Sequence, residues 1–243
     1  MGKPYAGVYF PGATQGTDTL DARGSTQSWV IDGRGGDDII YGGAEPDILF
    51  GNGGDDTLFG SPYDTVIDGG SGTDTVDFSL YETMNGLGVV ARVFGGMLHP
   101  NLPDGSVVEP LNSLLNVENL IGSSYDDILA GGRAVNELYG GAGNDLLLAR
   151  GAGDFLTGGV GTDIFDITGV SRTVTITDFH YNDGDRIQIE GDATFSWTEG
   201  MGKDADGNVE DAWIGTCDLL FGGTLQVIVL EADTTPSAGW IIG

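Results

Sequence analysis

Aspartate recurs at intervals of nine residues in two stretches of the chain, 33–77 and 122–166, each made of five nonapeptides. The sixth position of the nonapeptide is aspartate in eight of the ten copies. The residues there are Asp38, Asp47, Asp56, Asp74, Asp127, Asp145, Asp154 and Asp163, with Thr65 and Asn136 in the other two copies. Short carboxylates in tight loops, together with backbone carbonyls, are typical ligands of hard cations. The repeat therefore presents regularly spaced candidate ligands for such an ion.

Two other positions of the nonapeptide indicate how these loops are held. The first position is glycine in every copy except the one that begins at Ala149. The eighth position is always apolar: Ile40, Leu49, Leu58, Ile67, Val76, Leu129, Leu138, Leu147, Leu156 and Phe165. Positions seven to nine predict a short strand with one inward side chain, and positions one to six predict a glycine-rich turn. A single unit cannot form a core alone, so the units must stack into an all-β solenoid.

The nonapeptides GGSGTDTVD (69–77), GGAGNDLLL (140–148) and GGVGTDIFD (158–166) resemble the repeat of the RTX family of secreted bacterial proteins. That repeat is G-G-x-G-x-D-x-U-x, where U is apolar. The resemblance implies a right-handed parallel β-roll in which two nonapeptides make one turn. It also implies calcium ions between stacked loops on each flank. The C-terminal part is similar to the RTX modules of serralysin-type proteases and alginate epimerases.

Elementary geometry agrees with the calcium that the resemblance implies. Loops eighteen residues apart stack about 4.8 Å apart, and an ion bonded to oxygens at about 2.3–2.6 Å fits between them. The loops offer no histidine or cysteine, which disfavours transition metals, and magnesium demands stricter octahedral geometry. Besides the sixth-position side chains, the predicted ligands are turn carbonyls at Gly33, Gly35, Gly51, Gly53, Gly54, Gly69, Gly70, Gly72, Gly122, Gly140, Gly141, Gly143, Gly158, Gly159 and Gly161.

The same spacing separates strong sites from weak ones. On one flank of each block, three aspartates stack and define two intervals: Asp38, Asp56 and Asp74, and then Asp127, Asp145 and Asp163. On the opposite flanks, Asp47 faces the loop of Thr65, and Asn136 faces Asp154. Asp64 can replace Thr65 only if its loop is shifted. We therefore expect about four strong calcium sites and two weak or empty ones.

The segments outside the blocks are predicted to flank and close the roll. Residues 1–32 form an N-terminal cap, and residues 78–121 form an insertion that is either a stabilising hairpin extension or a binding flap. Within the insertion, 88–94 is strand-like and 109–116 is typical of a short helix. Residues 167–243 predict an antiparallel β cap, with an RTX-like type I secretion signal at its end. Asp178 and Asp185 are candidates for an additional ion there, and DADGNVED (204–211) favours a hairpin turn over an EF-hand.

Composition restricts the function. The chain has 37 acidic and 9 basic residues and a net charge of −28, which opposes nucleic acids and anionic membranes as partners. Its single cysteine excludes an internal disulfide framework, and no stretch predicts a membrane span or an N-terminal secretory signal. The catalytic motifs H-E-x-x-H, G-x-S-x-G and the P-loop are absent, so the chain is not expected to be an enzyme.

The sequence thus predicts a calcium-binding module that is exported by the type I secretion machinery and folds in extracellular calcium. Two alternatives stay open. One is a calcium-dependent adhesin, surface-layer or polysaccharide-binding module at the cell surface. The other is the accessory RTX module of a secreted enzyme whose catalytic domain lies outside this chain.

Overall fold

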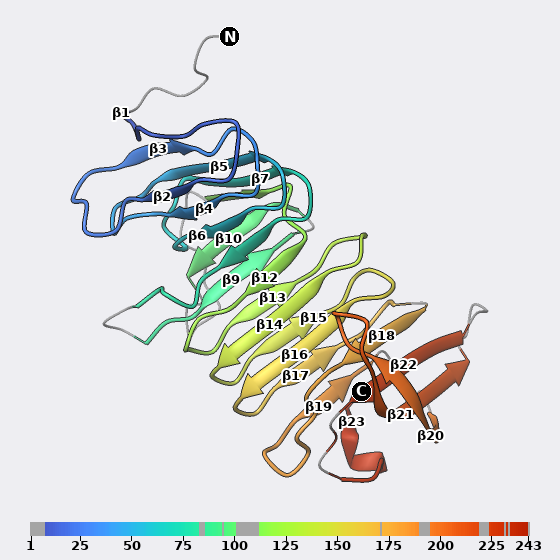
Figure 1. The fold of residues 1–243 in the computed structure, drawn as a ribbon. Helices are drawn as coiled ribbons and strands as arrows, with labels where there is room; N and C mark the ends of the chain where they lie inside the picture. The colour runs from blue at the N-terminus through green and yellow to red at the C-terminus, as the bar shows by residue number, and fades with distance from the viewer. Residues whose placement is uncertain are drawn as a thin grey trace. The chain divides into compact units, whose positions relative to one another are not determined.

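The computed structural model describes residues 8–82, 86–93, 95–100, 112–170, 172–189, 195–218, 224–230, 232 and 234–242. In these residues the chain is all-β, apart from the single 3-10 turn η1 (Ala238–Trp240). It divides into two compact units, Met1–Ser123 and Ser124–Gly243 (Figure 1). No helix in the described ranges is long and apolar enough to cross a membrane.

The first unit consists of two facing rows of parallel strands that the chain visits alternately. One row has the order β1 (Val8–Tyr9), β3 (Trp29–Asp32), β5 (Ile48–Gly53), β7 (Val66–Ser71) and β11 (Asn112–Leu115). The other has the order β2 (Thr19–Asp21), β4 (Ile39–Tyr41), β6 (Thr57–Phe59), β8 (Thr75–Asp77) and β12 (Asn119–Ile121). From β1 to β8, successive strands of the chain therefore lie in opposite rows, as expected for a parallel β-roll.

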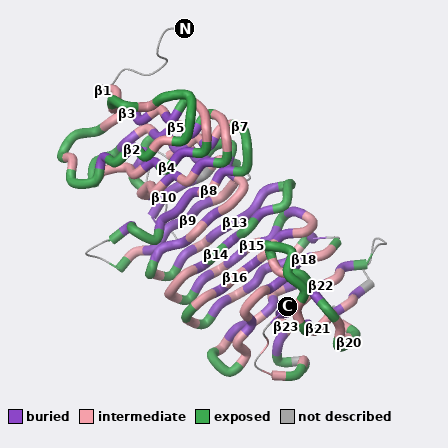
Figure 2. Tube along the Cα trace, in the orientation of Figure 1, coloured by how far each residue is buried: buried purple, intermediate pink, exposed green. Residues whose placement is uncertain are grey.

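The register confirms that two nonapeptides make one turn. Leu49 of β5 pairs with Ile67 of β7, and Leu58 of β6 pairs with Val76 of β8. Both pairs are eighteen residues apart and both join eighth-position residues, whose side chains are fully buried (Figure 2). Burial of one such Leu or Ile side chain contributes about 1.5–3 kcal/mol, so the shared core requires many stacked turns.

The insertion contains strands in the described part and corrects one prediction. The strand-like segment 88–94 contains β9 (Val89–Arg92), which pairs antiparallel with β10 (Met97–Pro100). The short helix predicted at 109–116 is wrong, because residues 112–115 form strand β11, while 109–111 lie outside the described residues. Leu114 pairs with Ile67 and is buried, whereas Leu115 is exposed. The free edge of β7 offers backbone hydrogen bonds along a whole strand, and this outweighs a marginal local preference for helix.

The second unit repeats the two-row arrangement. One row has the order β13 (Ile128–Ala130), β15 (Leu146–Leu148), β17 (Ile164–Asp166), β19 (Arg186–Gln188) and β23 (Ile241–Ile242). The other has the order β14 (Glu137–Ala142), β16 (Phe155–Val160), β18 (Thr173–Ile176), β22 (Thr224–Leu230), β21 (Val209–Asp218) and β20 (Ser196–Lys203). Leu147 pairs with Leu129 and Phe165, again at intervals of eighteen.

The C-terminal part is only partly antiparallel. Strands β18, β19, β22 and β23 continue the parallel rows, and antiparallel pairing is confined to β20, β21 and β22. The open edges of β16 and β17 explain this difference, since each added parallel strand satisfies one more row of backbone groups. Phe179 packs 4.5 Å from Trp240, measured between ring centroids, and both side chains are fully buried. These aromatics close the apolar core of the unit.

The acidic segment at 204–211 forms the hairpin that the sequence favours. It joins β20 to β21, and the Asp204 N–H donates to the Asn208 carbonyl at 3.1 Å. Both Asp204 carboxylate oxygens accept bonds from Asn208, so this side chain stabilises the turn.

Candidate metal centre

The sixth-position aspartates of the first unit form a hydrogen-bonded ladder along one flank. The backbone N–H of Asp38 donates to Asp56 Oδ1 at 2.8 Å, and the N–H of Asp56 donates to Asp74 Oδ1 at 2.9 Å. The ladder begins one turn earlier, where the Asp18 N–H donates to Asp38 Oδ1 at 2.7 Å. One oxygen of each carboxylate is thus fixed by the preceding turn, which aligns the side chains in a row.

The second unit contains the same ladder. The N–H of Asp127 donates to Asp145 Oδ1 at 2.8 Å, and the N–H of Asp145 donates to Asp163 Oδ1 at 2.9 Å. It extends beyond the nonapeptides, since the N–H of Asp163 donates to Asp185 Oδ1 at 2.9 Å. The structure therefore brings together the aspartates that the sequence places eighteen residues apart.

The ladder aspartates differ from ordinary turn aspartates in the hydrogen bonding of their second carboxylate oxygen, Oδ2. Within the described part of the chain, five of these atoms are buried and accept no hydrogen bond: Oδ2 of Asp38, Asp56, Asp74, Asp145 and Asp163. A buried polar atom without a partner costs about 1–3 kcal/mol, and more when it is charged. These five oxygens are therefore candidate cation ligands, since no donor among the described residues reaches them.

Backbone carbonyls converge on the same oxygens. A Cβ atom added to Gly51 would collide with both Asp56 Oδ2 and the Gly69 carbonyl oxygen. A Cβ atom added to Gly140 would meet Asp145 Oδ2 and the Gly158 carbonyl oxygen in the same way. The space beside each of these glycines, which we call a cradle, thus contains a carboxylate oxygen and a carbonyl oxygen and no hydrogen-bond donor between them. This is the oxygen-rich, donor-free surrounding that calcium requires.

On the opposite flanks, the equivalent oxygens are satisfied by the protein. Asp47 Oδ2 accepts the Gly43 N–H at 2.6 Å, and Asp154 Oδ2 accepts the Gly151 N–H at 3.0 Å. Asn136 Oδ1 likewise accepts the Gly132 N–H at 2.6 Å. These residues close Asx-type turns, so they have an evident structural role without an ion.

The loop of Thr65 is shifted by one residue. The Asp47 N–H donates to Asp64 Oδ1 at 2.9 Å, and Asp64 Oδ2 accepts the Ser61 N–H at 2.7 Å. Asp64 therefore occupies the place of the missing sixth-position aspartate, which the sequence allowed only with such a shift.

Comparison with known families identifies these loops. Residues 32–62, 50–79, 117–147 and 139–166 match the RTX calcium-binding nonapeptide repeat in four copies. The chain contains RTX calcium-binding repeats. RTX repeats bind calcium, and they are typical of extracellular proteins that are secreted by the type I route.

Among solved structures, the chain is similar to the extracellular lipase LipA from Serratia marcescens, with 20% sequence identity and a TM-score of 0.28. The match covers 90% of this chain and 40% of the lipase chain, so the RTX chain spans well under half of that protein. No curated protein matches the chain.

Burial raises the pKa values of the RTX aspartates. The pKa of Asp145 rises to about 8, and those of Asp74 and Asp163 rise to about 6. Desolvation is the main cause in each case, and the negative charges of neighbouring acids add to it. The pKa values of Asp38 and Asp56 are raised for the same reasons. Without a cation, the fold thus disfavours the charged form that a calcium ligand must adopt.

A glycine at the fourth position of the RTX loop marks the flank with unpartnered oxygens. The five loops of that kind carry Gly36, Gly54, Gly72, Gly143 and Gly161 there, and all five have positive φ. The loops of the opposite flanks carry Glu45, Tyr63, Ala134 and Ala152 instead. Only glycine adopts the left-handed region readily, so this position lets the loop turn its carbonyls toward the carboxylate. The predicted ligand set included four of these five glycines and omitted Gly36, but it did not use this position to distinguish the flanks.

The remaining predicted glycine ligands differ in their backbone conformation and in their position in the loop. At the second position, the predicted ligands Gly70, Gly141 and Gly159 have positive φ, whereas the third-position residues Gly35 and Gly53 do not. Gly122 is buried at the start of a loop with Tyr125 at its fourth position, and Asp127 of that loop is not among the aspartates with an unpartnered oxygen.

Asp178 and Asp185 have evident partners in the protein. Asp178 accepts the Gly158 and Gly159 N–H groups at 2.8 and 2.7 Å, and burial raises its pKa to about 6. Asp185 Oδ2 accepts the His180 N–H at 2.8 Å. An additional ion bound by these two residues stays a prediction.

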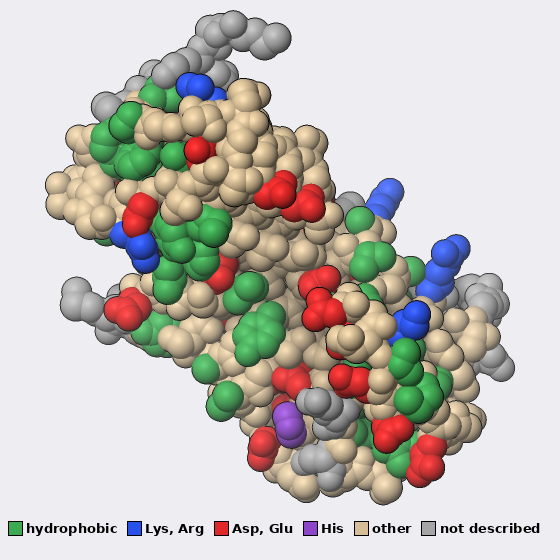
Figure 3. All heavy atoms as spheres, in the orientation of Figure 1, with side chains coloured by type: hydrophobic (Ala, Val, Ile, Leu, Met, Phe, Trp, Pro, Cys, Tyr) green, Lys and Arg blue, Asp and Glu red, His purple; other side chains and the backbone are tan. Residues whose placement is uncertain are grey.

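Side chains alone do not form a metal cluster in this RTX chain. Across the described ranges, no three His, Cys, Asp or Glu residues gather in a group that could hold a metal ion. This agrees with the ladder geometry, in which each loop contributes one carboxylate and the backbone contributes the remaining oxygens. Acidic side chains are visible on both units in Figure 3, in keeping with the net charge of −28.

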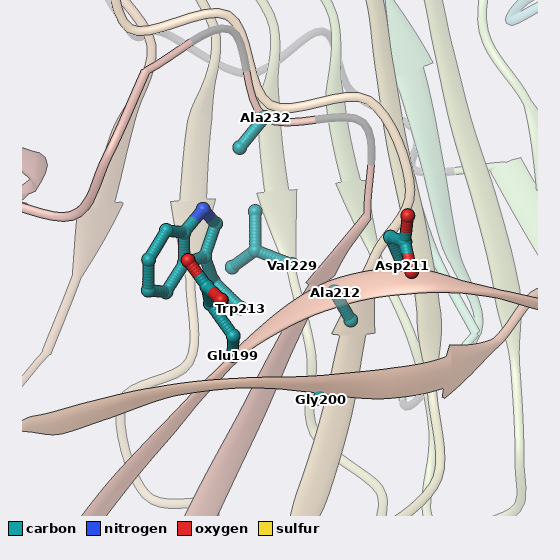
Figure 4. Close-up of a pocket in the computed structure, with 7 residues that line it drawn as sticks. All are labelled: Glu199, Gly200, Asp211, Ala212, Trp213, Val229 and Ala232. Atoms are coloured by element: carbon teal, nitrogen blue, oxygen red, sulfur yellow. The ribbon is translucent and has the colours of Figure 1, made fainter.

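A separate hollow of about 450 Å³ lies on the antiparallel part of the second unit (Figure 4). Its lining includes Trp213, Glu199 and Asp211, with Ala232 above Trp213 in the view. Glu199 and Trp213 are cross-strand partners of β20 and β21. An indole ring and two carboxylates therefore share one concave surface.

Proposed function

We propose that this chain is a secreted calcium-binding RTX β-roll module, exported by the type I machinery and folded by extracellular calcium. The unpartnered, buried Oδ2 atoms of the ladder aspartates are the main support for this proposal. They face backbone carbonyls, and no protein donor reaches them in the described part of the chain. A bound calcium ion supplies the charge that these oxygens lack.

The energetics favour a switch between unfolded and folded chains. Each site that binds only the folded state adds RT ln(1 + [Ca]/Kd), which is about 1.4 kcal/mol at ten times Kd. Four such sites add about 6 kcal/mol, which is comparable to the whole stability of a typical domain. Extracellular calcium modules have Kd values of about 10⁻⁴–10⁻³ M. A chain with sites of this grade stays unfolded where calcium is scarce and folds where it is abundant.

The proposal is tested by circular dichroism of the full chain, first dialysed free of calcium and then titrated to millimolar calcium. We expect a strand spectrum only in the titrated sample, with a cooperative transition. Millimolar magnesium is the control and should leave the spectrum unchanged. A native strand spectrum in the calcium-free sample would refute folding by calcium, even if the folded chain then bound the ion.

A second candidate function is a glycan-binding module at the cell surface, and the hollow at Trp213 favours it. Aromatic faces stack on sugar rings, and the two carboxylates accept bonds from hydroxyl groups. Among the described residues, the lining of the hollow has acidic side chains and no basic ones, which disfavours acidic polysaccharides and favours neutral ones. Affinity electrophoresis in neutral polysaccharide gels tests this. Retardation should be lost in Trp213→Ala and retained in Met201→Ala, an exposed residue of the same sheet that does not line the hollow.

A further inference from the structure

We infer a further calcium site between Asp74 and Glu118, where the insertion returns to the first unit. This site deepens the proposed function and depends on it, because it uses the same ion and the same ladder. Glu118 lies outside both nonapeptide blocks, and the spacing of the repeat does not predict it.

The backbone places Glu118 at the sixth position of a further turn. In the repeat, the Thr75 N–H donates to the Asp56 carbonyl at 2.8 Å. After the insertion, the Asn119 N–H donates to the Asp74 carbonyl at 2.9 Å, and Asn119 pairs with Thr75 in the sheet. Asn119 is therefore the seventh-position residue of the next turn, and Glu118 immediately precedes it.

The side chain of Glu118 also continues the ladder. The N–H of Asp74 donates to Glu118 Oε2 at 2.9 Å, although the two residues are 44 positions apart. Asp38 and Asp56 donate in the same way to the aspartates of the turns that follow them. Asp74 Oδ2 is left buried, with the residue fully inaccessible to solvent, and no atom of the described residues donates to it.

A backbone carbonyl completes the cradle. A Cβ atom added to Gly69 would collide with the Asn116 carbonyl oxygen and would lie 2.6 Å from Asp74 Oδ2. At Gly51 the same two kinds of oxygen, from Asp56 and Gly69, converge on the glycine. The interval between Asp74 and Glu118 thus repeats the arrangement of the interval between Asp56 and Asp74.

The loop of this turn is shorter, and this explains why glutamate replaces aspartate. Only Asn116 and Val117 separate strand β11 from Glu118, whereas five residues precede the sixth-position aspartate in a nonapeptide. Asn116 has a positive φ of 47°, which turns the chain sharply after the strand. The contracted loop enters the turn from a different direction than a nonapeptide does, and the longer side chain of glutamate still reaches the Asp74 N–H.

The hydrogen bond from the Asp74 N–H to Glu118 leaves the buried Oδ2 of Asp74 without an explanation. It brings a second negative charge close to this carboxylate oxygen, which has no donor among the described residues. Burial, followed by the charges of Asp56 and Glu118, raises the pKa of Asp74 to about 6. A divalent cation between the two residues removes this repulsion and uses the unpartnered oxygen.

The test counts bound calcium in the full chain by equilibrium dialysis at saturating calcium. Glu118→Gln keeps an acceptor for the Asp74 N–H but removes the charge, and it should bind one calcium ion fewer than the unchanged chain. Glu82→Gln, which removes an exposed charge of the same unit, should bind the full number. An unchanged count in Glu118→Gln would overturn this site while leaving the proposed function intact. If the unchanged chain binds no calcium, the proposed function fails first.

A second variant covers the case in which Glu118→Gln does not fold in millimolar calcium. Glu118→Asp retains the charge but shortens the side chain by one methylene in the contracted loop. Its weakest site should bind calcium several-fold more weakly than the weakest site of the unchanged chain, with the full count restored at higher calcium. Identical affinities at every site would overturn the inference.

Discussion

The backbone N–H of Asp56 donates a 2.9 Å hydrogen bond to Oδ1 of Asp74, eighteen residues later in the chain. The other oxygen of Asp74 is buried and has no donor among the described residues. One carboxylate oxygen is therefore hydrogen-bonded to the preceding turn, and the other is free to bind a cation. Under the proposed function, stacking of the turns positions this ligand and the bound ion removes the cost of burying it, so folding and calcium binding are linked.

Asp145 and Asp47 should respond differently to the same substitution. Both are buried sixth-position aspartates, but Asp145 Oδ2 has no protein donor within the described ranges, whereas Asp47 Oδ2 accepts the Gly43 N–H. Asp145→Asn should reduce the calcium bound per chain and raise the calcium midpoint of folding about tenfold, equivalent to about 1.4 kcal/mol. A calcium titration followed by circular dichroism and dialysis measures both quantities.

Asp47→Asn is the matched control for this prediction. It weakens a turn hydrogen bond, so the folded chain should lose about 0.5–2 kcal/mol of stability, much as when a side-chain cap is lost. The number of bound calcium ions should not change. Equal loss of calcium from the two variants would show that the flanks do not differ in the way the hydrogen bonds indicate.

Replacing the glycine at the first loop position should reduce calcium binding most where that glycine lines a cradle. Gly51→Ala places a methyl group against Asp56 Oδ2 and the Gly69 carbonyl oxygen, in the space where these oxygens converge. The substitution should abolish calcium binding at that interval and lower the calcium-loaded melting temperature by several degrees. Gly42→Ala on the opposite flank meets its nearest oxygens, from Asp47 and Phe59, only at 3.3 Å. It should leave the calcium count unchanged, and an equal effect of the two substitutions would contradict the cradle.

The strands and their register could be predicted from the sequence because the apolar eighth position of the nonapeptide determines them. Leu49, Leu58 and their equivalents must all point inward, and only a turn of eighteen residues places them in line. The stacked aspartates follow from the same constraint, since a fixed period that aligns the core also aligns the loops. The predicted ladder residues are accordingly those that the structure brings together.

The return from the insertion could not be predicted from the period, because its loop is contracted. Leu114 takes the eighth position opposite Ile67, yet only two residues separate its strand from Glu118. A search in steps of nine residues misses this turn, and the local pattern of leucines resembles a helix. The sequence separated the two flanks by their aspartates, but it did not show the hydrogen bonds behind the difference, since these depend on where loop N–H groups point. The N–H of Gly43 reaches Asp47, while no equivalent N–H in the described loops reaches Asp56 Oδ2.

The calcium-free chain should become more stable as the pH is lowered from 8 toward 5.5. Burial raises the pKa of Asp145 to about 8 and those of Asp74 and Asp163 to about 6, whereas an unfolded aspartate titrates near 3.9. Between these values the folded chain binds more protons than the unfolded chain, so the free energy of unfolding falls as the pH rises. Because the calcium-free chain is expected to be unfolded in plain buffer, the thermal melts are recorded without calcium in a stabilising osmolyte that populates the folded state. The range stops at pH 5.5 because the isoelectric point is about 4.1.

Saturating calcium should reverse the trend, because protons and calcium compete for the same oxygens. The calcium-loaded chain should melt at a higher temperature at pH 8 than at pH 5.5, while the calcium-free chain shows the opposite order. The opposite pH dependence of the two melting temperatures is the decisive result, since a general effect of net charge would change both melting temperatures in the same direction. A calcium-free melting temperature that rises with pH would mean that the buried aspartates are not the groups that resist folding without the ion.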